Sequence, residues 1–553
     1  MADDNDAAAA QPLLGRIEDG GRQRAVARRR RVILATFVTG LVLLTAFTAA
    51  GILFAKRNAN KRGRGKPNVI LMISDGFGPA SETLARNYYQ YTHGVPEGHQ
   101  LPLDTILVGS SRTRSSDSFV TDSAAGATAF SCGIKTYNGA IAVNPEQKPC
   151  GTVLEAAKEK GYLTGMIVTS RITHATPACF ASHADSRALE DDIALHEIGN
   201  YTLGRRVDLM FGGGACFFKP NTDPFSCRSD DINAYAIAKE LGWHIASSDR
   251  TLFDALDPAS VSLPLLNLFA NDHMSYEIDR DNAVQPSLKE MTVKALDILT
   301  LSERHSKGFF LMIEGSRIDM AAHNNDPAAH VREVLAYNEA IDAVKDFIDR
   351  NPETVLISVS DHETGGLSVG LQLDPHAYPD YFWNPEALVN VQRSTEIVAP
   401  EITNFTGPPS ARTAFVRDIV FPQWLAIADA TDAEIAAVAL PGAPYEDVIA
   451  ALGTALSRRA GLGWSTHGHS AVDVNLYAYG RNAHELRGNH ENTDIGKFIV
   501  RQMGLDLEPV TAQLNRDPPN KDMRAESGRG KRGAFQVEHY PHPSLGSRAV
   551  SSL

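Results

Sequence analysis

Short apolar runs alternate with longer stretches of mixed polarity along most of the chain. Six runs have the length and the Val, Ile, Leu and Phe content of buried strands, at 69–74, 164–169, 207–211, 309–313, 355–360 and 474–479. Helical periodicity lies between them and is clearest at 327–350, where the apolar residues share one face. The alternation predicts an α/β fold with a large, mostly parallel sheet covered by helices on both faces.

The regions outside this alternation predict the domain organisation. Residues 1–31 read as a disordered cytosolic tail, 32–55 as a transmembrane helix and 56–66 as a basic linker. Residues 67–510 form the expected catalytic body. Within it, 371–460 carries no metal-type motif and reads as an inserted cap or crown region. Residues 511–553 turn polar and are expected to be a disordered or processed tail.

Residues 32–55 contain no charged side chain over 24 positions. A bilayer-spanning helix needs about 20 such residues, so the segment predicts a membrane anchor. The alternative is a cleaved signal peptide, which is disfavoured because the run is long and no clear small-residue cleavage site follows. Basic residues flank both ends, so the large body after the span decides the predicted orientation: a single-pass type II protein with its body in a lumen. The acceptor triplets at Asn200 and Asn404 agree with that side of the membrane.

Charge and cysteine content narrow the classes of function. The net charge is −13, although residues 1–66 hold 13 Lys and Arg against 5 Asp and Glu. The acidic body excludes a general nucleic-acid binder, which requires a basic face. Five cysteines permit disulfides in an oxidising lumen with one thiol left over, and Cys216 and Cys227, which flank a polar loop, are the expected pair. Five buried thiols are the alternative.

Acidic and histidine side chains recur at the predicted strand ends. Asp319 and His323 are four residues apart after the strand 309–313, so both project to one side of a helix or tight turn and can share a zinc ion. Glu314, at the end of that strand, can face a second ion. Other strand ends offer Asp75, Asp361 with His362, and His467 with His469.

Taken singly, these strand-end residues have simpler interpretations as turns, helix caps or surface residues. The carboxyl ends of parallel strands meet at one edge of a sheet, so the set together predicts a cluster of divalent metals. Such clusters are a recurring device for phosphoryl transfer.

Ser123 lies in a run of small residues, Thr121-Asp122-Ser123-Ala124-Ala125-Gly126-Ala127, that could open a helix. A helix N-cap is the simpler interpretation of this serine. A nucleophilic serine requires activation by a base or a metal, and no histidine is near in sequence, so metal activation is the natural option. Asp122 could hold a neighbouring arginine.

Six motifs carry a resemblance to a known family and occur in one order between residues 66 and 500. They are Asp75-Gly76, Thr121-Asp122-Ser123-Ala124, Thr173-His174-Ala175-Thr176-Pro177, Glu314-Gly315-Ser316-Arg317-Ile318-Asp319, Ser360-Asp361-His362-Glu363 and Thr466-His467-Gly468-His469. Together they resemble the metal-dependent alkaline phosphatases, particularly the membrane-anchored vacuolar types of fungi.

This resemblance implies a function and a role for each residue. Small phosphate monoesters would be hydrolysed through a phosphoserine on Ser123, with Arg187 clamping the phosphate and Asp122 beside both. The implied first zinc site is Asp319, His323 and His469, the second is Asp75, Asp361 and His362, and a magnesium site is Asp75, Thr176 and Glu314. The resemblance also implies a homodimer and a vacuole-like lumen.

Two positions depart from the family's pattern. His174 stands where some bacterial members have Asp, which reduces the negative charge beside the magnesium site. Met320 stands where many members have a polar or basic residue, so no phosphate contact is expected from it. His469 is chosen over His467 as the zinc ligand because of its distance from the strand that follows.

Two other functions fit parts of this pattern. A sulfatase would have Pro and Arg after its nucleophile, and the residues after Ser123 lack both; a related phosphodiesterase would not be expected to need the third metal implied by Glu314 and Thr176. An inactive membrane-anchored scaffold would usually have lost ligands or nucleophile, and here all are present.

Overall fold

The computed structural model describes residues 26–30, 67–245, 249–302 and 306–516. Residues 1–65 and 66–553 separate into two units. In the first unit, residues 26–30 are helical. The predicted membrane span at 32–55 lies outside the described residues, and no helix among the described ones is both long and apolar enough to cross a bilayer.

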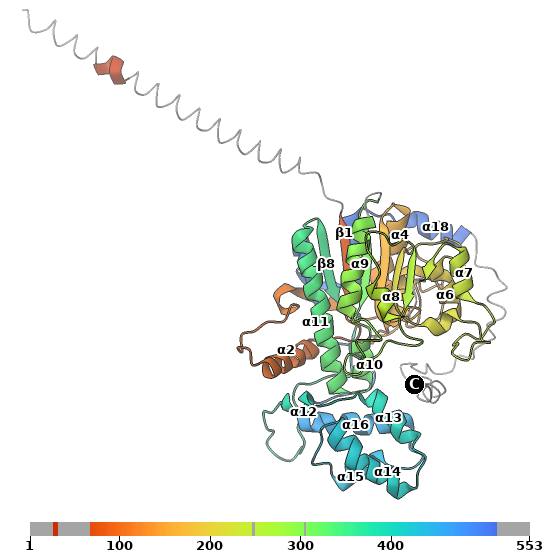
Figure 1. The fold of residues 1–553 in the computed structure, drawn as a ribbon. Coiled ribbons are helices and arrows are strands. Elements are labelled where there is room, and N and C mark those ends of the chain that lie inside the picture. The colour runs from red at the N-terminus through yellow and green to blue at the C-terminus, as the bar shows by residue number, and fades with distance from the viewer. Residues whose placement is uncertain (1–25, 31–66, 246–248, 303–305, 517–553) are drawn as a thin grey trace, which may run out of the picture. The chain divides into compact units, whose positions relative to one another are not determined.

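A ten-stranded mixed sheet forms the centre of the second unit (Figure 1). Its spatial order is β12 (Gly488–Glu491), β2 (Leu107–Arg112), β11 (Val474–Gly480), β8 (Thr354–Val359), β1 (Asn68–Ile73), β7 (Phe309–Glu314), β3 (Leu163–Arg171), β4 (Leu209–Gly213), β6 (Leu265–Leu268) and β5 (His244–Ile245). Every pairing is parallel except those of β11, which runs antiparallel to β2 and β8. All six predicted strands are present, and the prediction of a mostly parallel sheet holds with β11 as the exception.

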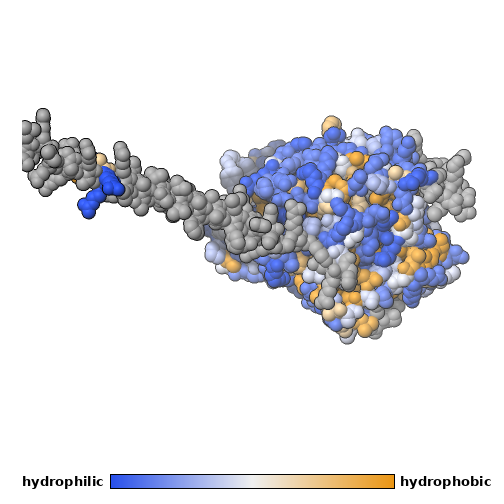
Figure 2. Space-filling view, turned by 90° about the horizontal axis from the view of Figure 1, so that it is seen from above, coloured by the Kyte–Doolittle hydropathy of each residue, from blue (hydrophilic) through white to orange (hydrophobic). Residues whose placement is uncertain are grey.

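Alternate side chains of each central strand enter two separate apolar layers. In β7, Phe309, Leu311 and Ile313 belong to one layer, while Phe310 and Met312 belong to the other. Both faces of the sheet are therefore buried, which explains why the strands read as continuous apolar runs. The outer surface differs: the face in Figure 2 is mainly hydrophilic, with hydrophobic residues in smaller groups.

Helices cover both faces of the sheet. One apolar layer receives α2 (Pro79–His93), α9 (Leu288–Ser302) and α11 (Pro327–Arg350), and the other receives α3 (Ser123–Cys132), α4 (Val153–Glu159), α5 (Ala175–Ala181) and α17 (Asn492–Met503). The predicted helix at 327–350 matches α11 in full. The backbone N–H groups of Ala328 and Ala329 donate to the Asp326 carboxylate, so that residue caps the start of α11.

Residues 371–460 form a helical group at one end of the body (Figure 1). It contains α12 (Glu386–Val389), α13 (Thr395–Thr403), α14 (Pro409–Phe415), a π-helical stretch (Val416–Trp424), α15 (Asp432–Val438) and α16 (Tyr445–Ala460). The start of α13 attaches to the body: the N–H of Thr395 donates to Asp326 (2.7 Å) and Glu396 pairs with Arg317 (2.6 Å).

The remaining described helices are α6 (Glu190–Ile198), α7 (Ala234–Glu240), α8 (Arg250–Asp254), α10 (Arg317–His323) and α18 (Glu508–Arg516), and a small second sheet pairs β9 (Glu363–Thr364) with β10 (His469–Ser470). Helix α18 includes residues 511–516, which the sequence analysis assigned to the tail. Val510 and Leu514 are buried in the apolar layer of α17, and this packing accounts for the difference. Residues 517–553 lie outside the described part.

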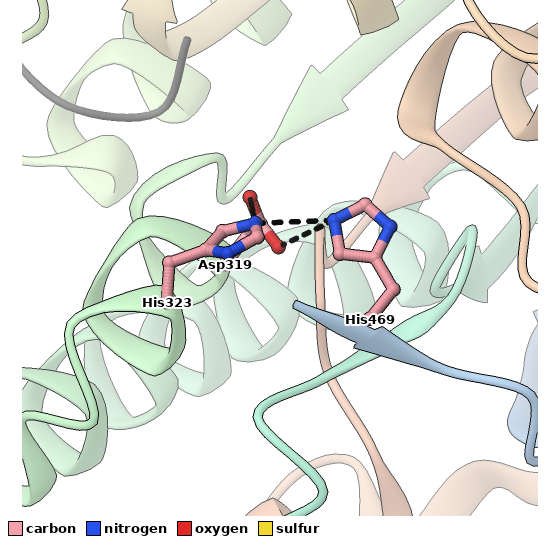
Figure 3. Close-up of side chains that lie close together, drawn as sticks. All are labelled: Asp319, His323 and His469. Carbon is pink, nitrogen blue, oxygen red and sulfur yellow. Dashed lines mark hydrogen bonds and ion pairs between the residues drawn. The ribbon is translucent and has the colours of Figure 1, made fainter. Parts of the chain in front are cut away.

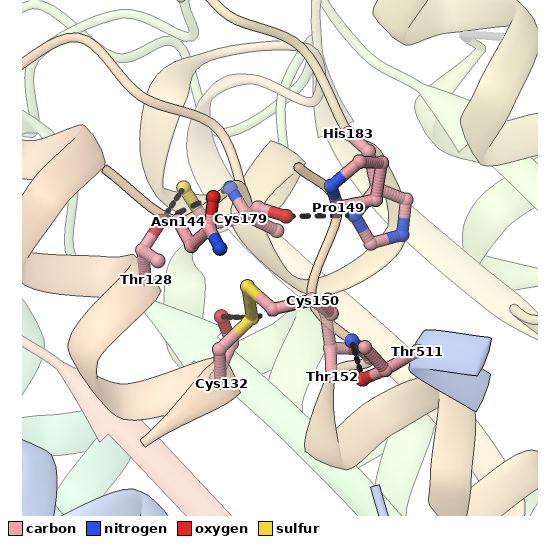
Figure 4. Close-up of a disulfide and its surroundings, with 12 residues drawn as sticks. Thr128, Cys132, Asn144, Pro149, Cys150, Thr152, Cys179, His183 and Thr511 are labelled. Carbon is pink, nitrogen blue, oxygen red and sulfur yellow. Dashed lines mark hydrogen bonds between the residues drawn. A yellow bond between two sulfur atoms is a disulfide. The ribbon is translucent and has the colours of Figure 1, made fainter. Parts of the chain in front are cut away.

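Two disulfides lie on the α3 side of the sheet, and one of them includes Cys132, the last residue of α3. Cys216–Cys227 is the predicted pair, and Cys132–Cys150 is a second one that the sequence analysis did not identify (Figure 4). Cys150 reaches the end of α3 because the chain folds back after Ala142: Cys150 N donates to Ala142 O (3.0 Å), and Asn144 N donates to Lys148 O (2.8 Å). Cys179 is the remaining thiol and is buried, as the odd count predicts.

His183, beside this disulfide in Figure 4, forms a buried ion pair with Glu155. Its Nε2 lies 2.8 Å from the carboxylate, and its Nδ1 donates to the Ala142 carbonyl (2.9 Å). Burial lowers the pKa of His183, but Glu155 outweighs that effect and holds the pKa above its ordinary value of 6.5. The His183 ring therefore loses its proton at a higher pH in the folded protein than in the unfolded chain.

Replacing His183 by glutamine is expected to lower the melting temperature more at about pH 6 than at about pH 9. The ion pair stabilises the fold fully below the unfolded-state pKa, and that stabilisation is lost as the pH rises through the raised folded-state pKa. Thermal melts of the metal-loaded protein across this range measure the difference. An equal loss at both pH values would show that the ring contributes packing and not charge.

Candidate active site

Strand register brings the predicted acidic residues to one edge of the sheet. Ile73 of β1 is level with Glu314 of β7 and with Val359 of β8, so Asp75 and Asp361, each two residues further on, lie at the same level. Gly76 permits the close approach of α10: its φ is +73°, and a Cβ there would lie 2.6 Å from Cα of Asp319. The predicted convergence of strand ends is therefore present.

Asp319, His323 and His469 form the first candidate metal group (Figure 3). The two residues from α10 project to the same side, as the four-residue spacing predicts, and His469 comes from β10. The Asp319 carboxylate lies 3.4 Å from Nε2 of His323 and 3.7 Å from Nε2 of His469, and those two nitrogens are 3.1 Å apart. One carboxylate and two imidazoles are a donor set typical of a catalytic zinc site.

Backbone carbonyls orient both histidines of this group. Nδ1 of His469 donates to Thr121 O at 2.7 Å, and Nδ1 of His323 donates to His467 O. These bonds leave both Nε2 atoms directed at Asp319, and such outer hydrogen bonds fix the tautomer of a metal-binding histidine. The side chain of His467 instead donates from Nδ1 to His323 O (2.7 Å) and is not a member of this candidate group.

The second candidate group comprises Asp75, Asp319 and His362, all fully buried. Asp319 thus belongs to both groups, whereas the sequence analysis assigned it to the first alone. The predicted member Asp361 is adjacent, with its carboxylate 3.4 Å from Nε2 of His362. Ser123 is the first residue of α3, and its Oγ lies 3.1 Å from Nε2 of His362 and 3.4 Å from Asp75. The predicted nucleophile therefore lies against the second group.

The predicted magnesium ligands also come together. Thr176 Oγ1, Glu314 Oε1 and Asp75 Oδ2 are buried and make no hydrogen bond within the described part of the chain. Burial raises the pKa of Glu314 to about 7, and the neighbouring Ser316, Thr176 and Asp75 side chains offset part of that rise. Buried oxygens without hydrogen-bond partners are costly unless a cation or water binds them. Hard oxygen donors of this kind suit magnesium.

Asp122 holds the predicted phosphate-binding arginine. Its carboxylate caps α3 by accepting from Ala125 N (2.9 Å), and its other oxygen accepts from Nη1 of Arg187 (3.1 Å). The second Arg187 nitrogen, Nη2, lies 3.1 Å from Nε2 of His174. The guanidinium is thus fixed beside the nucleophile and the predicted magnesium ligands. In that position its planar fork can bind two phosphate oxygens.

Met320 has a packing role. It is buried with Tyr276, Ala321 and Ala329 in a small apolar cluster. Arg317 lies over the Tyr276 ring at 3.7 Å and pairs with Glu396 of α13. Met320 thus packs in the cluster that contains Tyr276, and Tyr276 contacts the arginine that pairs with the 371–460 region.

Several side chains that were not predicted from the sequence hold the acidic residues. Thr364 Oγ1 donates to Asp319 (2.5 Å), and the hydroxyls of Ser316 (2.6 Å) and Ser170 (3.4 Å) face Glu314. Ser316 lies inside one quoted motif and Thr364 directly follows another, which is a signal that could have found them. Ser170 has no such signal because it reaches Glu314 from β3.

The site concentrates negative charge that protein groups balance only in part. Burial and repulsion from Asp319 and Glu314 raise the pKa of Asp361 to about 8, and burial with repulsion from Asp361 and Asp319 raises that of Asp75 well above its usual range. Burial lowers the pKa of His362, so this ring is neutral and able to bind a metal. The donor types, their burial and their mutual repulsion all fit bound divalent cations.

Comparisons with known proteins agree with this geometry. The alkaline phosphatase family profile matches residues 66–505. The chain is 43% identical to the repressible alkaline phosphatase of Saccharomyces cerevisiae (94% of each chain covered) and 48% identical to an alkaline phosphatase of Schizosaccharomyces pombe (86% of this chain, 89% of that one).

Among solved structures, the Thermus thermophilus alkaline phosphatase superposes with a TM-score of 0.68 at 28% identity, covering 82% of this chain and 96% of that one. A mutant of the alkaline phosphatase from the Antarctic bacterium TAB5, with magnesium bound in its M3 site, gives a TM-score of 0.56 at 28% identity, covering 80% of this chain and 99% of that one. The chain therefore belongs to the alkaline phosphatase family, is a hydrolase of phosphate monoesters, and is of the fungal type.

Proposed function

We propose that this hydrolase acts through a phosphoserine on Ser123, with two zinc ions and one magnesium ion. The observation that carries the proposal is the position of Ser123 Oγ, within 3.4 Å of both His362 and Asp75 and beside a fixed Arg187. Asp319, His323 and His469 would hold the first zinc, Asp75, Asp361 and His362 the second, and Asp75, Thr176 and Glu314 the magnesium. The bound metals would supply charge compensation and a lowered pKa for the oxygens that attack and leave.

The residues of the chain then have separate tasks in two displacements. Arg187 binds two phosphate oxygens and turns the phosphorus toward Ser123. Ser123 loses its hydroxyl proton, and its oxygen forms the new bond to phosphorus while the ester bond breaks and the departing alcohol oxygen takes up a proton in exchange. Water then attacks the phosphoserine, its oxygen bonds to phosphorus as the bond to Ser123 breaks, and one of its protons returns Ser123 to the hydroxyl form. Asp122 keeps Arg187 in place through both steps, and this positioning is most of what phosphoryl transfer requires of the protein.

Removal of the metals is the direct test of the cofactor assignment. Chelation of the full chain is expected to abolish hydrolysis of 4-nitrophenyl phosphate, and zinc with magnesium is expected to restore it, because the buried acids have only partial counter-charge of their own. Metal analysis should give more zinc than magnesium. Full recovery with magnesium alone would contradict the zinc assignment.

We also propose the cellular setting that the sequence indicates: a single-pass type II membrane protein anchored by 32–55, a vacuole-like lumen, and a homodimer. Asn200 and Asn404 are both exposed, so each is accessible for the proposed glycosylation. Alkaline extraction of membranes, mobility before and after deglycosylation, and light scattering of the detergent-solubilised chain test these assignments separately.

A further inference from the structure

We propose that Asn138 is a positioning residue for the catalytic site, because one side-chain amide fixes the segment that carries the nucleophile. Asn138 lies in the turn Tyr137–Ala140, closed by a bond from Ala140 N to Tyr137 O (3.2 Å). Gly139 follows with a φ of +91°, a conformation that favours glycine. The inference rests on the proposed role of Ser123 and Arg187.

The Asn138 side chain brackets Thr121 from both sides. Its Oδ1 accepts from Asp122 N (3.1 Å), and its Nδ2 donates to Val120 O (3.0 Å). The peptide groups on both sides of Thr121 are therefore held by one side chain. An amide is suited to this task because it offers a donor and an acceptor together. Asn138 itself is held by its backbone N–H, which donates to Asp117 (3.1 Å).

The bracketed segment controls three parts of the site. The Thr121 carbonyl accepts from Nδ1 of His469, which orients a ligand of the first metal group. Asp122 fixes the guanidinium of Arg187 and caps α3. Ser123 is the next residue and begins that helix. A shift of the Thr121–Asp122 peptide would therefore move a metal ligand, the phosphate clamp and the nucleophile together.

The same turn also contacts the loop that carries Arg187. Gly139 N donates to the Asp122 carboxylate (2.9 Å), and Arg187 N donates to Gly139 O (2.8 Å). The Tyr137 hydroxyl donates to Asp185 O (2.9 Å). Three contacts thus connect the turn with the two sides of the Asp122–Arg187 pair. Asn138 makes both contacts of its bracket with one side chain, so a single substitution removes them together.

The test compares two variants of the full, metal-loaded chain with a matched control. Asn138→Ala removes the donor and the acceptor, and Asn138→Asp keeps the shape and turn preference but loses the donor to Val120 O. Asn351→Ala is the control: Asn351 is likewise half-buried, and its Nδ2 donates to one carbonyl, Phe347 O (2.9 Å), at the far end of α11. The readouts are kcat/KM for 4-nitrophenyl phosphate, the inhibition constant of inorganic phosphate, zinc content and melting temperature.

Both Asn138 variants are expected to lose about tenfold to a hundredfold in kcat/KM, the usual effect of removing a residue that orients a metal ligand. Phosphate inhibition should weaken in the same variants because Arg187 is less well fixed, while the melting temperature stays close to that of the wild type. The Asn351 control should match the wild type in kcat/KM and in phosphate inhibition.

Other outcomes would overturn the inference. The inference is wrong if both Asn138 variants match the wild type in kcat/KM and in phosphate inhibition. It is also wrong if the variants only melt at a lower temperature while the kinetics of the folded fraction stay unchanged. Wild-type and Ser123→Ala proteins assayed in parallel separate this failure from that of the proposed function. If the wild type is inactive, or if Ser123→Ala retains full activity, the proposed function fails and the inference fails with it.

Discussion

Replacing Ser123 by alanine is expected to lower kcat for 4-nitrophenyl phosphate by about a thousandfold or more, the range seen when a catalytic nucleophile is removed. Its Oγ is the hydroxyl that lies against both His362 and Asp75, so the substitution removes the proposed attacking oxygen from the site. The backbone bond that caps α3 runs from Ala125 to Asp122 and does not involve the serine hydroxyl. Melting temperature and zinc content should therefore remain near wild-type values.

Ser131→Ala is the matched control for this variant. Ser131 is also fully buried on α3, and within the described part of the chain its hydroxyl makes only a long contact with the Cys132 sulfur at 3.9 Å. Its kcat should stay near that of the wild type. Acid-quenched wild-type protein incubated with phosphate should carry one phosphoryl group on the peptide containing Ser123, and the Ser123→Ala protein should carry none. Full activity in that variant, or an adduct on another residue, would refute the nucleophile.

The central strands were predictable because both of their faces are buried. β1, β7 and β8 are runs of mostly apolar residues, NVILMI, FFLMIE and TVLISV, and all of their residues are buried. β2 and β12 were not predicted, because their faces are not fully buried. Their sequences, LVGSSR and GNHE, are polar and partly exposed, and they become strands only because β11 and then β2 offer a backbone edge.

In the candidate site as well, some residues can be predicted from the sequence and others can be found only from the fold. Asp75, Asp361 and Glu314 could be found because parallel strands bring their ends together, whatever the details of packing. Asn138 could not, because its role depends on the amide meeting the backbone of Val120 and Asp122 in space. Turn residues such as Asn-Gly are common, and nothing in that pair indicates which backbone groups the side chain will contact.

Asp319→Asn is expected to lower the metal content of the protein more than His469→Ala does. Asp319 is the residue shared by both candidate groups, so its loss weakens two sites, whereas His469 belongs to one. Asparagine keeps the shape of the side chain and can still accept from Thr364, but its neutral oxygen is a poorer zinc ligand. Metal analysis of gel-filtered proteins measures the difference, with His467→Ala as the control from the same loop.

The same substitution should change stability in opposite directions with and without metal. In the metal-free protein, the Asp319 carboxylate repels Asp75 and Asp361 and contributes to their raised pKa values. A carboxyl group with a raised folded-state pKa destabilises the fold as the pH rises toward that value, so removing one charge should raise the melting temperature of the metal-free protein near neutral pH.

In the metal-loaded protein, the bound cations turn this repulsion into attraction, and binding stabilises the folded state. Asp319→Asn should then melt below the wild type. A variant that melts above the wild type without metal and below it with metal has lost a metal ligand. Loss of a merely structural carboxylate would instead lower the melting temperature in both states. A variant that binds as much metal as His469→Ala would show that Asp319 serves one group alone.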